Sequence, residues 1–259
     1  MSEFVVAKVE IEETAATIAA ERDYLEAAVD AIKSARAKIE KQIRRDDFFL
    51  TTLEPYETPK DGSPVVKRMC EAAKLAGVGP MATVAGTIAQ EAVEAMAAQG
   101  LTHGWVDNGG DVALMLESPA TLEVFSDPGY KTAFALELEP TEGITGICSS
   151  SGRIGHSISF GNADVALAIA DSAILADALA TAIGNRVANQ DSLKTCFDPF
   201  KGLDGFIGGL AMIEGAVSMH GRLPSLVEVE HNAERLTSHS KMSSPRFIGP
   251  YDQCSEVRT

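Results

Sequence analysis

The chain of 259 residues carries 22 Lys and Arg against 37 Asp and Glu, a formal net charge of −15. This balance disfavours nucleic acid and anionic membranes as main partners, because both bind basic surfaces. The start of the chain lacks the basic region of a signal peptide, and the four cysteines are widely spaced, so we expect a cytoplasmic protein. The longest uncharged run, residues 75–90, contains several Gly and a Pro and is interpreted as a buried loop and helix.

The first hundred residues predict strands followed by helices. Residues 4–20 alternate as one or two strands would, and helical spacing begins at Glu21 and continues to Arg45. Pro64 occupies a favourable first position for a second helix. A helix of small residues opens near Pro80 and continues to about Gln99, and its composition allows close packing against a neighbour.

The rest of the chain predicts mainly strands, with one central helix. Residues 143–163 form a Gly/Ser-rich loop, 165–170 a buried strand, and Ser172 caps a helix that ends near Val187. Further strands are expected at 104–106, 112–116, 121–125 and 134–138, with a closing hairpin over 206–219.

These elements predict an α+β protein with antiparallel or mixed sheets flanked by helices, because the strands occur in clusters and not in strict alternation with helices. Each half of the chain offers strands on both sides of a helix, so an internally duplicated unit is one reading. We expect a single domain over residues 1–235 and a loosely held polar tail over 236–259.

The first candidate site is the turn between the strands at 104–106 and 112–116. Its sequence, Asn108-Gly109-Gly110-Asp111, offers an amide and a carboxylate beside two glycines that let a ligand approach the backbone. A plain hairpin turn of the Asn-Gly type explains the same residues equally well.

The second candidate is the stretch 143–163, which holds five glycines and five serines but no Asp or Glu. Free backbone amides, hydroxyls and a guanidinium suit a phosphate or a similar anion, and we favour this over a flexible loop. The residues concerned are Ser150, Ser151, Gly152 and Arg153 for the anion, His156 as acid or base, and Cys148 as a reactive thiol or a small buried residue.

The third candidate is Ala176-Asp177-Ala178-Leu179-Ala180-Thr181-Ala182, in the central helix. Asp177 and Thr181 are one turn apart and share a face. A carboxylate and a hydroxyl among small residues provide ligands for Mg²⁺, with the phosphates of a ligand completing its shell. A solvated surface Asp fits poorly, since residues 172–183 hold no other charge.

Taken in order, VDNGGDV, SSGRIGH and ADALATA resemble the hallmark segments of the ApbE superfamily of Mg²⁺-dependent flavin transferases. These enzymes cleave FAD and attach FMN to a protein Thr or Ser, or hydrolyse FAD. The longer blocks RDDFFLTTLEP, VVKRMCEAAKLAGVGPMATVAG and GICSSSGRIGHSISFGNAD resemble an uncharacterised ApbE-like branch of prokaryotes.

The resemblance implies two fused T-fold-like units with the site between them, Mg²⁺ on Asp177 and Thr181, and FAD or FMN near the Asn108–Asp111 turn. His156 lies near the position of a family His that opens a His-Ile-Ile-Asp-Pro-Arg-Thr-Gly-like segment. Here the chain continues Ser-Ile-Ser-Phe-Gly, without the Asp, Pro or Arg, so flavin transfer is lost or altered while metal binding persists.

Three functional hypotheses follow. The first is an enzyme or binder acting on a phosphorylated, flavin-type nucleotide with Mg²⁺. The second is a sulfur-assimilation factor in homocysteine formation, a role linked to the similar branch, in which Cys148 handles sulfur and partner proteins take part. The third is a scaffold that keeps the fold without the chemistry. Symmetric self-association as a homo-oligomer is the default expectation for such a protein.

Overall fold

The computed structural model describes residues 3–124, 133–150, 161–229, 246–248 and 256–258. The α-helices are α1 (Leu25–Arg45), α2 (Phe48–Thr51), α3 (Pro64–Ala76), α4 (Val84–Ala97) and α5 (Ala173–Arg186). The strands are β1 (Phe4–Ile11), β2 (Thr14–Glu21), β3 (Gly104–Asn108), β4 (Asp111–Met115), β5 (Ala120–Val124), β6 (Ala133–Leu138), β7 (Thr145–Ser150), β8 (Val165–Ala170), β9 (Phe206–Ile213), β10 (Ala216–Gly221), β11 (Ser225–Val229), β12 (Arg246–Ile248) and β13 (Glu256–Arg258).

Two sheets organise the described chain. The larger has the order β10-β9-β8-β7-β4-β3-β2-β1-β13, and the smaller has the order β11-β6-β5-β12. In the larger sheet all pairs are antiparallel except β1 with β13. Apart from β13, the larger sheet consists of β1 to β4 and β7 to β10, and in each set of four a helical segment connects the second strand to the third. The internal duplication stays a prediction.

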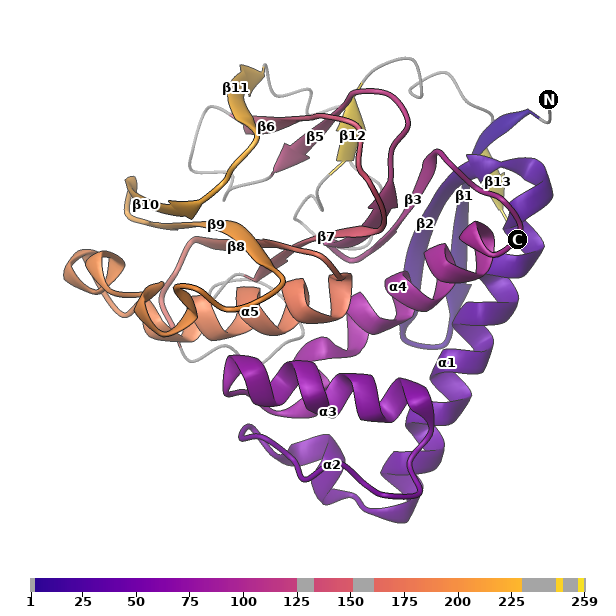
Figure 1. Ribbon diagram of the computed structural model, residues 1–259, viewed down its shortest axis with the longest axis horizontal. Helices are drawn as coiled ribbons and strands as arrows, with labels where there is room; N and C mark the ends of the chain where they lie inside the picture. The colour runs from indigo at the N-terminus through magenta and orange to yellow at the C-terminus, as the bar shows by residue number, and fades with distance from the viewer. Residues whose placement is uncertain (1–2, 125–132, 151–160, 230–245, 249–255, 259) are drawn as a thin grey trace.

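The larger sheet separates two hydrophobic cores (Figure 1). Helices α4 and α5 pack against one face, over β3, β4, β7 and β8, and the smaller sheet lies over the other. Along β8 the small side chains of Ala166 and Ala168 face the helices, whereas Leu167 and Ile169 face the smaller sheet. Small residues on the helical side let α5 lie close to the sheet, which matters for the candidate site.

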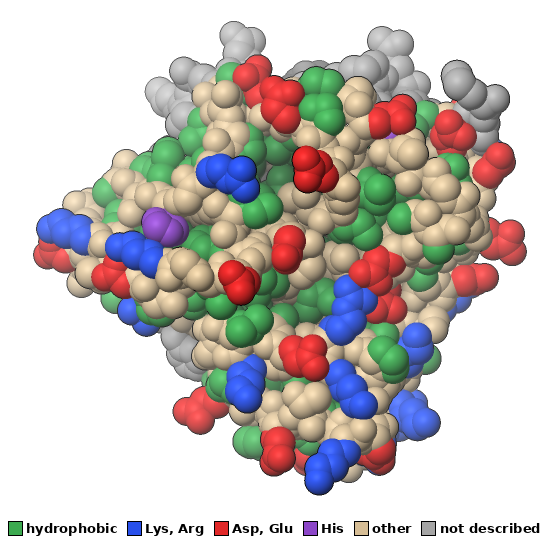
Figure 2. All heavy atoms as spheres, viewed as in Figure 1, with side chains coloured by type: hydrophobic (Ala, Val, Ile, Leu, Met, Phe, Trp, Pro, Cys, Tyr) green, Lys and Arg blue, Asp and Glu red, His purple; other side chains and the backbone are tan. Residues whose placement is uncertain are grey.

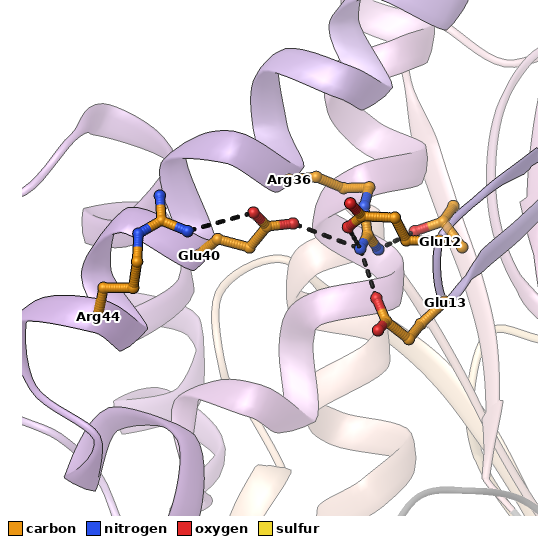
Figure 3. A network of polar contacts seen from close by, with 6 residues as sticks. Glu12, Glu13, Arg36, Glu40 and Arg44 are labelled. Carbon is orange, nitrogen blue, oxygen red and sulfur yellow. Dashed lines mark hydrogen bonds and ion pairs between the residues drawn. The ribbon is translucent and has the colours of Figure 1, made fainter.

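Arg36 joins α1 to the turn between β1 and β2 (Figure 3). Its guanidinium donates to Thr14 Oγ1 at 2.7 Å and to Glu12 at 2.6 Å, and it also bonds Glu13 and Glu40. The positive charge lowers the pKa of Glu12 and Glu13. The network fixes α1 against the first hairpin. Helix α4 packs between α1 and α5.

Several predicted local features are confirmed. Pro64 begins α3, and Ser172 caps α5 by accepting a hydrogen bond from Leu175 N. The strand at 165–170 is buried along its whole length, and the hairpin of β9 and β10 turns at Glu214 and Gly215. The mixed α+β class with sheets flanked by helices is likewise confirmed.

Three predictions need correction. Thr145–Ser150, predicted as part of a loop, is a strand hydrogen-bonded between β4 and β8 in the middle of the larger sheet. The helix predicted from Pro80 begins as a short 3-10 turn, and α4 starts only at Val84. The tail is not simply loose, because residues 246–248 pair with β5 and residues 256–258 pair with β1.

Acidic and basic side chains interleave on the face shown in Figure 2, with Lys and Arg most frequent over α1 to α3. No helix within the described ranges combines the length and the apolar character that crossing a bilayer requires.

Candidate functional site

The hairpin that joins β3 and β4 presents the predicted ligand turn. Asn108 pairs with Asp111, which leaves Gly109 and Gly110 at the turn with φ of +70° and +106°. Positive φ at both positions favours glycine for conformational reasons, as in a tight two-residue hairpin. Asp107 Oδ1 accepts from Gly110 N at 2.8 Å, so the turn is closed by its own carboxylate. The hairpin reading is therefore confirmed, and a ligand role for the same residues stays a prediction.

This turn is fixed against the start of α4 and the adjacent strand β7. Asn108 Nδ2 donates to Ala85 O at 3.2 Å. Asp111 stands opposite Cys148 in the sheet, and Ser149 Oγ donates to Gly110 O at 3.3 Å. Asp111 is 9% exposed, and its Oδ1 has no hydrogen-bond partner within the described residues.

Helix α5 places Asp177 and Thr181 in the interior, where both are at most 9% exposed. Asp177 Oδ2 accepts from Gly86 N at 2.8 Å, so the carboxylate faces the first turn of α4. The helices approach closely here, since a Cβ at Gly86 would lie 2.8 Å from Asp177 Cβ. The burial of Asp177 excludes the solvated surface Asp considered from the sequence.

Two buried carboxyl groups, those of Asp111 and Asp177, lie near each other on the helical side of the larger sheet, whereas Asp107 pairs with Val112 and faces the other side. Burial raises the pKa of Asp177 and of Asp107 to about 7, although backbone amides oppose the shift. The pKa of Asp111 is raised further by burial and then by the negative charge of Asp177. Among the described residues, no cationic group contributes to these three pKa shifts.

A cation is what such a cluster lacks, because buried like charges are costly unless they are neutralised. Carboxylate and hydroxyl oxygens are the ligands that Mg²⁺ takes, usually together with waters and substrate phosphates. The free Oδ1 of Asp111 leaves an oxygen atom for a metal, and the Asp177 carboxylate accepts from the backbone amides of Gly86 and Ala85. Across the described residues no group of three His, Cys, Asp or Glu side chains has the geometry of a protein-only metal site. The arrangement thus fits Mg²⁺ held partly by a ligand.

The two flanks of the acid-free stretch, at Ser150 and Gly161, both contact α5. Ser150 ends β7, and its side chain lies 3.7 Å from a Cβ built on Gly184. Gly161 lies against the same residue, because a Cβ there would be 1.8 Å from Gly184 O. Both flanks therefore meet α5 one turn beyond Thr181. The candidate residues Ser151, Gly152, Arg153 and His156 lie outside the described residues.

Cys148 lies inside the cluster and is fully buried. Its thiol donates to Ala173 O at 3.4 Å and faces Asp111. Burial, and then the charges of Asp111 and Asp177, raise the pKa of the thiol well above its usual value. These surroundings keep the sulfur protonated, whereas nucleophilic chemistry needs the thiolate.

We expect Cys148 in the native protein to resist alkylation by iodoacetamide at pH 8, because the thiol is both covered and protonated. Peptide mapping by mass spectrometry should show the modification only after unfolding in urea. Rapid labelling of Cys148 in the folded protein would contradict this assignment and would favour the reactive-thiol hypothesis.

Sequence reasoning did not identify the contribution of α4. Gly86 and Gln90 both reach α5, Gly86 through Asp177 and Gln90 through Ala173 N at 2.8 Å. The available signal was the uncharged run 75–90, whose small residues predicted close packing without naming the neighbour.

Proteins of similar sequence occur in archaea. The chain is 45% identical over 231 residues to a UPF0280 protein of Methanocella arvoryzae, which covers 89% of this chain and 94% of that protein. It is 39% identical over 235 residues to a UPF0280 protein of Archaeoglobus fulgidus, covering 89% and 97% respectively.

Solved structures share the fold. The apo form of the Pseudomonas stutzeri flavinyl transferase ApbE matches with a TM-score of 0.57 at 11% identity, over 84% of this chain and 94% of that one. The ApbE protein of Thermotoga maritima matches with a TM-score of 0.54 at 14% identity, over 85% and 97%. A family model described as AbpE bacteria matches residues 3–218. The chain therefore belongs to the AbpE bacteria family, an ApbE-like branch that includes the archaeal UPF0280 proteins.

Proposed function

We propose that this protein binds a phosphorylated flavin nucleotide, FAD or FMN, together with Mg²⁺, and that it acts as a divergent flavin transferase or nucleotide hydrolase. One observation carries the proposal. Asp111 and Asp177 are both buried, and the charge of Asp177 raises the pKa of Asp111, while no basic side chain of the described residues is among the groups that shift these two pKa values. The flanks of the acid-free stretch contact the same helix, α5, at Gly184. A metal–phosphate pair would satisfy both features at once, because the cation neutralises the acids and the stretch accommodates the anion.

Asp177 and Thr181 would hold the metal, and Asp111 would contribute its free oxygen. Bound Mg²⁺ supplies positive charge that orients the phosphates and stabilises charge developing on a transferred phosphoryl group. The chain's own part is to exclude water from this charge, since α4, α5 and β7 enclose the carboxylates. A low local dielectric strengthens each of these interactions.

The remaining candidate residues would bind and activate the nucleotide. The turn at Asn108, Gly109 and Gly110 offers a close backbone approach for the flavin nucleotide, and residues 150–153 offer hydroxyls, amides and the Arg153 guanidinium for its phosphates. His156 would act as acid or base. Support for the flavin comes from the fold shared with a flavinyl transferase, while the altered segment after His156 leaves hydrolysis as a competing outcome.

Calorimetry with FAD tests the binding proposal. We expect FAD to bind in the presence of Mg²⁺ and to lose most of its affinity in EDTA. Asp177→Asn should weaken the Mg²⁺-dependent affinity by about 100-fold or more, since even outer-shell partners of a metal contribute about 10- to 100-fold. Asp191→Asn, at an exposed residue paired with Lys194, is the matched control and should bind like the wild type. Equal affinity of the Asp177 and Asp191 variants would refute the metal assignment.

Product analysis separates the two chemistries. Hydrolysis adds water across the pyrophosphate of FAD and yields free FMN and AMP, whereas transfer yields AMP and FMN bound through a phosphoester to a protein hydroxyl. We expect AMP by chromatography in either case, and the state of the flavin after denaturation identifies the reaction. Binding without AMP release would leave a flavin-binding protein and exclude both enzymatic readings.

The sulfur-assimilation hypothesis finds less support in the described residues. It requires Cys148 to act as a thiolate toward a sulfur donor or a partner protein, whereas burial and two neighbouring carboxyls hold this thiol protonated. A persulfide detected on Cys148 by mass spectrometry after treatment with a persulfide donor, which transfers its outer sulfur and leaves as a thiol, would reverse this preference.

A further inference from the structure

The first peptide amide of α5 is bound by a side chain from another helix. Ser172 caps the helix by accepting from Leu175 N, which leaves the amide of Ala173 to be satisfied elsewhere. Gln90, on α4 and only 4% exposed, accepts from Ala173 N through Oε1 at 2.8 Å. This bond joins residues 83 positions apart in the sequence and ties the two helices together in the interior.

The orientation of the Gln90 amide is imposed by its other neighbour. Its Nε2 donates to Glu94 Oε1 at 3.0 Å, and Glu94 in turn accepts from Arg68 at 2.6 and 2.8 Å. An ionised carboxylate only accepts, so the nitrogen of Gln90 must face Glu94 and the oxygen must face Ala173. The donors converge on Glu94, since Ala173 N donates to Gln90 and both Gln90 and Arg68 donate to Glu94, so the network links α3, α4 and the start of α5.

A second bond lies one helical turn further along. Gly86 N on α4 donates to Asp177 on α5, while Gln90 holds Ala173. Both pairs of residues are separated by four positions, so the two bonds fix the register of antiparallel helices. A displaced α5 would lose both together and would move Asp177.

Ala173 is also the point at which α5 contacts the sheet. A Cβ at Gly146 would lie 2.4 Å from Ala173 Cα, and Ala173 O accepts from the thiol of Cys148. Cys148 stands opposite Asp111 in the β4–β7 pair. The position of Ala173 thus relates the two carboxylates, since it is joined to Asp111 through the sheet and to Asp177 through the helix.

We propose that Gln90 is a positioning residue that sets the placement of Asp177 relative to Asp111 and thereby the affinity of the site for a divalent cation. This inference rests on the proposed function, because it requires a metal at these carboxylates. Gln90 itself touches neither the cation nor the nucleotide, and it acts through the Ala173 amide.

The test is a titration of the full chain with Mn²⁺, followed by electron paramagnetic resonance of the free ion. Gln90→Met removes both hydrogen bonds at similar volume and should weaken Mn²⁺ binding about tenfold, the effect expected for an outer-shell partner. Gln42→Met replaces another buried glutamine, on α1, and should leave the affinity within twofold of the wild type. This control removes general loss of stability as an explanation.

A charge swap provides the rescue. Gln90→Glu alone places two carboxylates at the distance of the former hydrogen bond and should weaken Mn²⁺ binding as strongly as Gln90→Met. Adding Glu94→Gln restores a donor between the two positions, keeps an acceptor for Ala173 N and for Arg68, and should recover most of the affinity. Wild-type affinity in Gln90→Met, or no recovery in the double variant, would overturn the positioning role alone. Absence of Mn²⁺ binding by the wild type, both without FAD and with saturating FAD, would overturn the proposed function and this inference with it.

Discussion

Replacement of Gly86 by alanine is expected to destabilise the protein by about 2 to 3 kcal/mol, the cost of forcing an extra methyl group into a closed contact. A Cβ at this position would lie 2.2 Å from Ala173 O and 2.8 Å from Asp177 Cβ. The first of these atoms belongs to the backbone, so the clash is relieved only if α5 moves away from α4. The movement would also break the hydrogen bond from Gly86 N to Asp177.

Gly184→Ala is the matched control, because it introduces the same group into the other helix. There the nearest atom to the new Cβ is Ala166 Cβ at 3.4 Å, an ordinary contact. The substitution should therefore be neutral or stabilise by roughly 0.5 to 1 kcal/mol through helix propensity. Urea unfolding of both variants measures the difference. Equal free energies of unfolding would show that α4 and α5 are not in contact at Gly86.

Local sequence signals predict one part of the fold, and contacts between distant segments determine the rest. Local signals suffice where a residue type strongly favours one position in a helix, as Pro64 does in the first turn of α3 and Ser172 at the cap of α5. The strand over 165–170 is also evident, because a run of six apolar residues is typical of a buried strand. These features depend on neighbours within a few positions.

The loop predicted over 145–150 is wrong because contacts between distant segments decide the structure there. Gly146 and Ser149 are poor strand formers, and their composition predicts a loop. The chain is nevertheless extended there because β4 and β8 supply hydrogen bonds on both sides, and glycine is required because Ala173 lies where a side chain would be. Tertiary contact overrides propensity, and a single sequence does not reveal that contact.

The candidate site divides in the same way. Helical spacing alone places Asp177 and Thr181 on one face, and the two glycines after Asn108 predict the turn. The contact of this turn with α5 depends on the pairing of Asp111 with Cys148. The contact of α4 with α5 depends on two hydrogen bonds, whose partners are 83 and 91 positions apart in the sequence. Gly86 and Gln90 therefore look like ordinary helix residues until the fold is known.

The metal-free protein is expected to lose stability as the pH rises from 5 to 8. Asp107 and Asp177 have pKa values of about 7 in the folded protein, against 3.8 for the free side chain, and the pKa of Asp111 is raised further. In this range the folded state binds protons that the unfolded chain has already released, so the free energy of unfolding falls with pH. For each group, one unit of difference between its pKa in the folded and in the unfolded state corresponds to about 1.4 kcal/mol of unfolding free energy once the titration is complete.

Other groups do not obscure this trend. The carboxylates bound to Arg36, Glu12 and Glu13, have pKa values lowered by their hydrogen bonds to this guanidinium, which moves their titration in the folded protein away from this pH range. Burial lowers the pKa of His103 below its usual 6.5, so this group adds stability as the pH rises and works in the opposite direction. Thermal unfolding in EDTA at pH 5, 6, 7 and 8 measures the sum. A melting temperature that is constant or rises over this range would contradict the raised pKa values of these acids.

Mg²⁺ and one isosteric variant connect the pH dependence to function. Millimolar Mg²⁺ should raise the melting temperature of the wild type at pH 8 more than at pH 5, because the cation binds the ionised carboxylates and a ligand of the folded state stabilises it. Asp111→Asn removes one of the repelling charges, so it should be more stable than the wild type in EDTA at pH 8 and should gain little from Mg²⁺. A carboxylate that weakens the metal-free fold yet is needed for the cation's effect is retained for binding, since a structural role alone would favour the amide at this position.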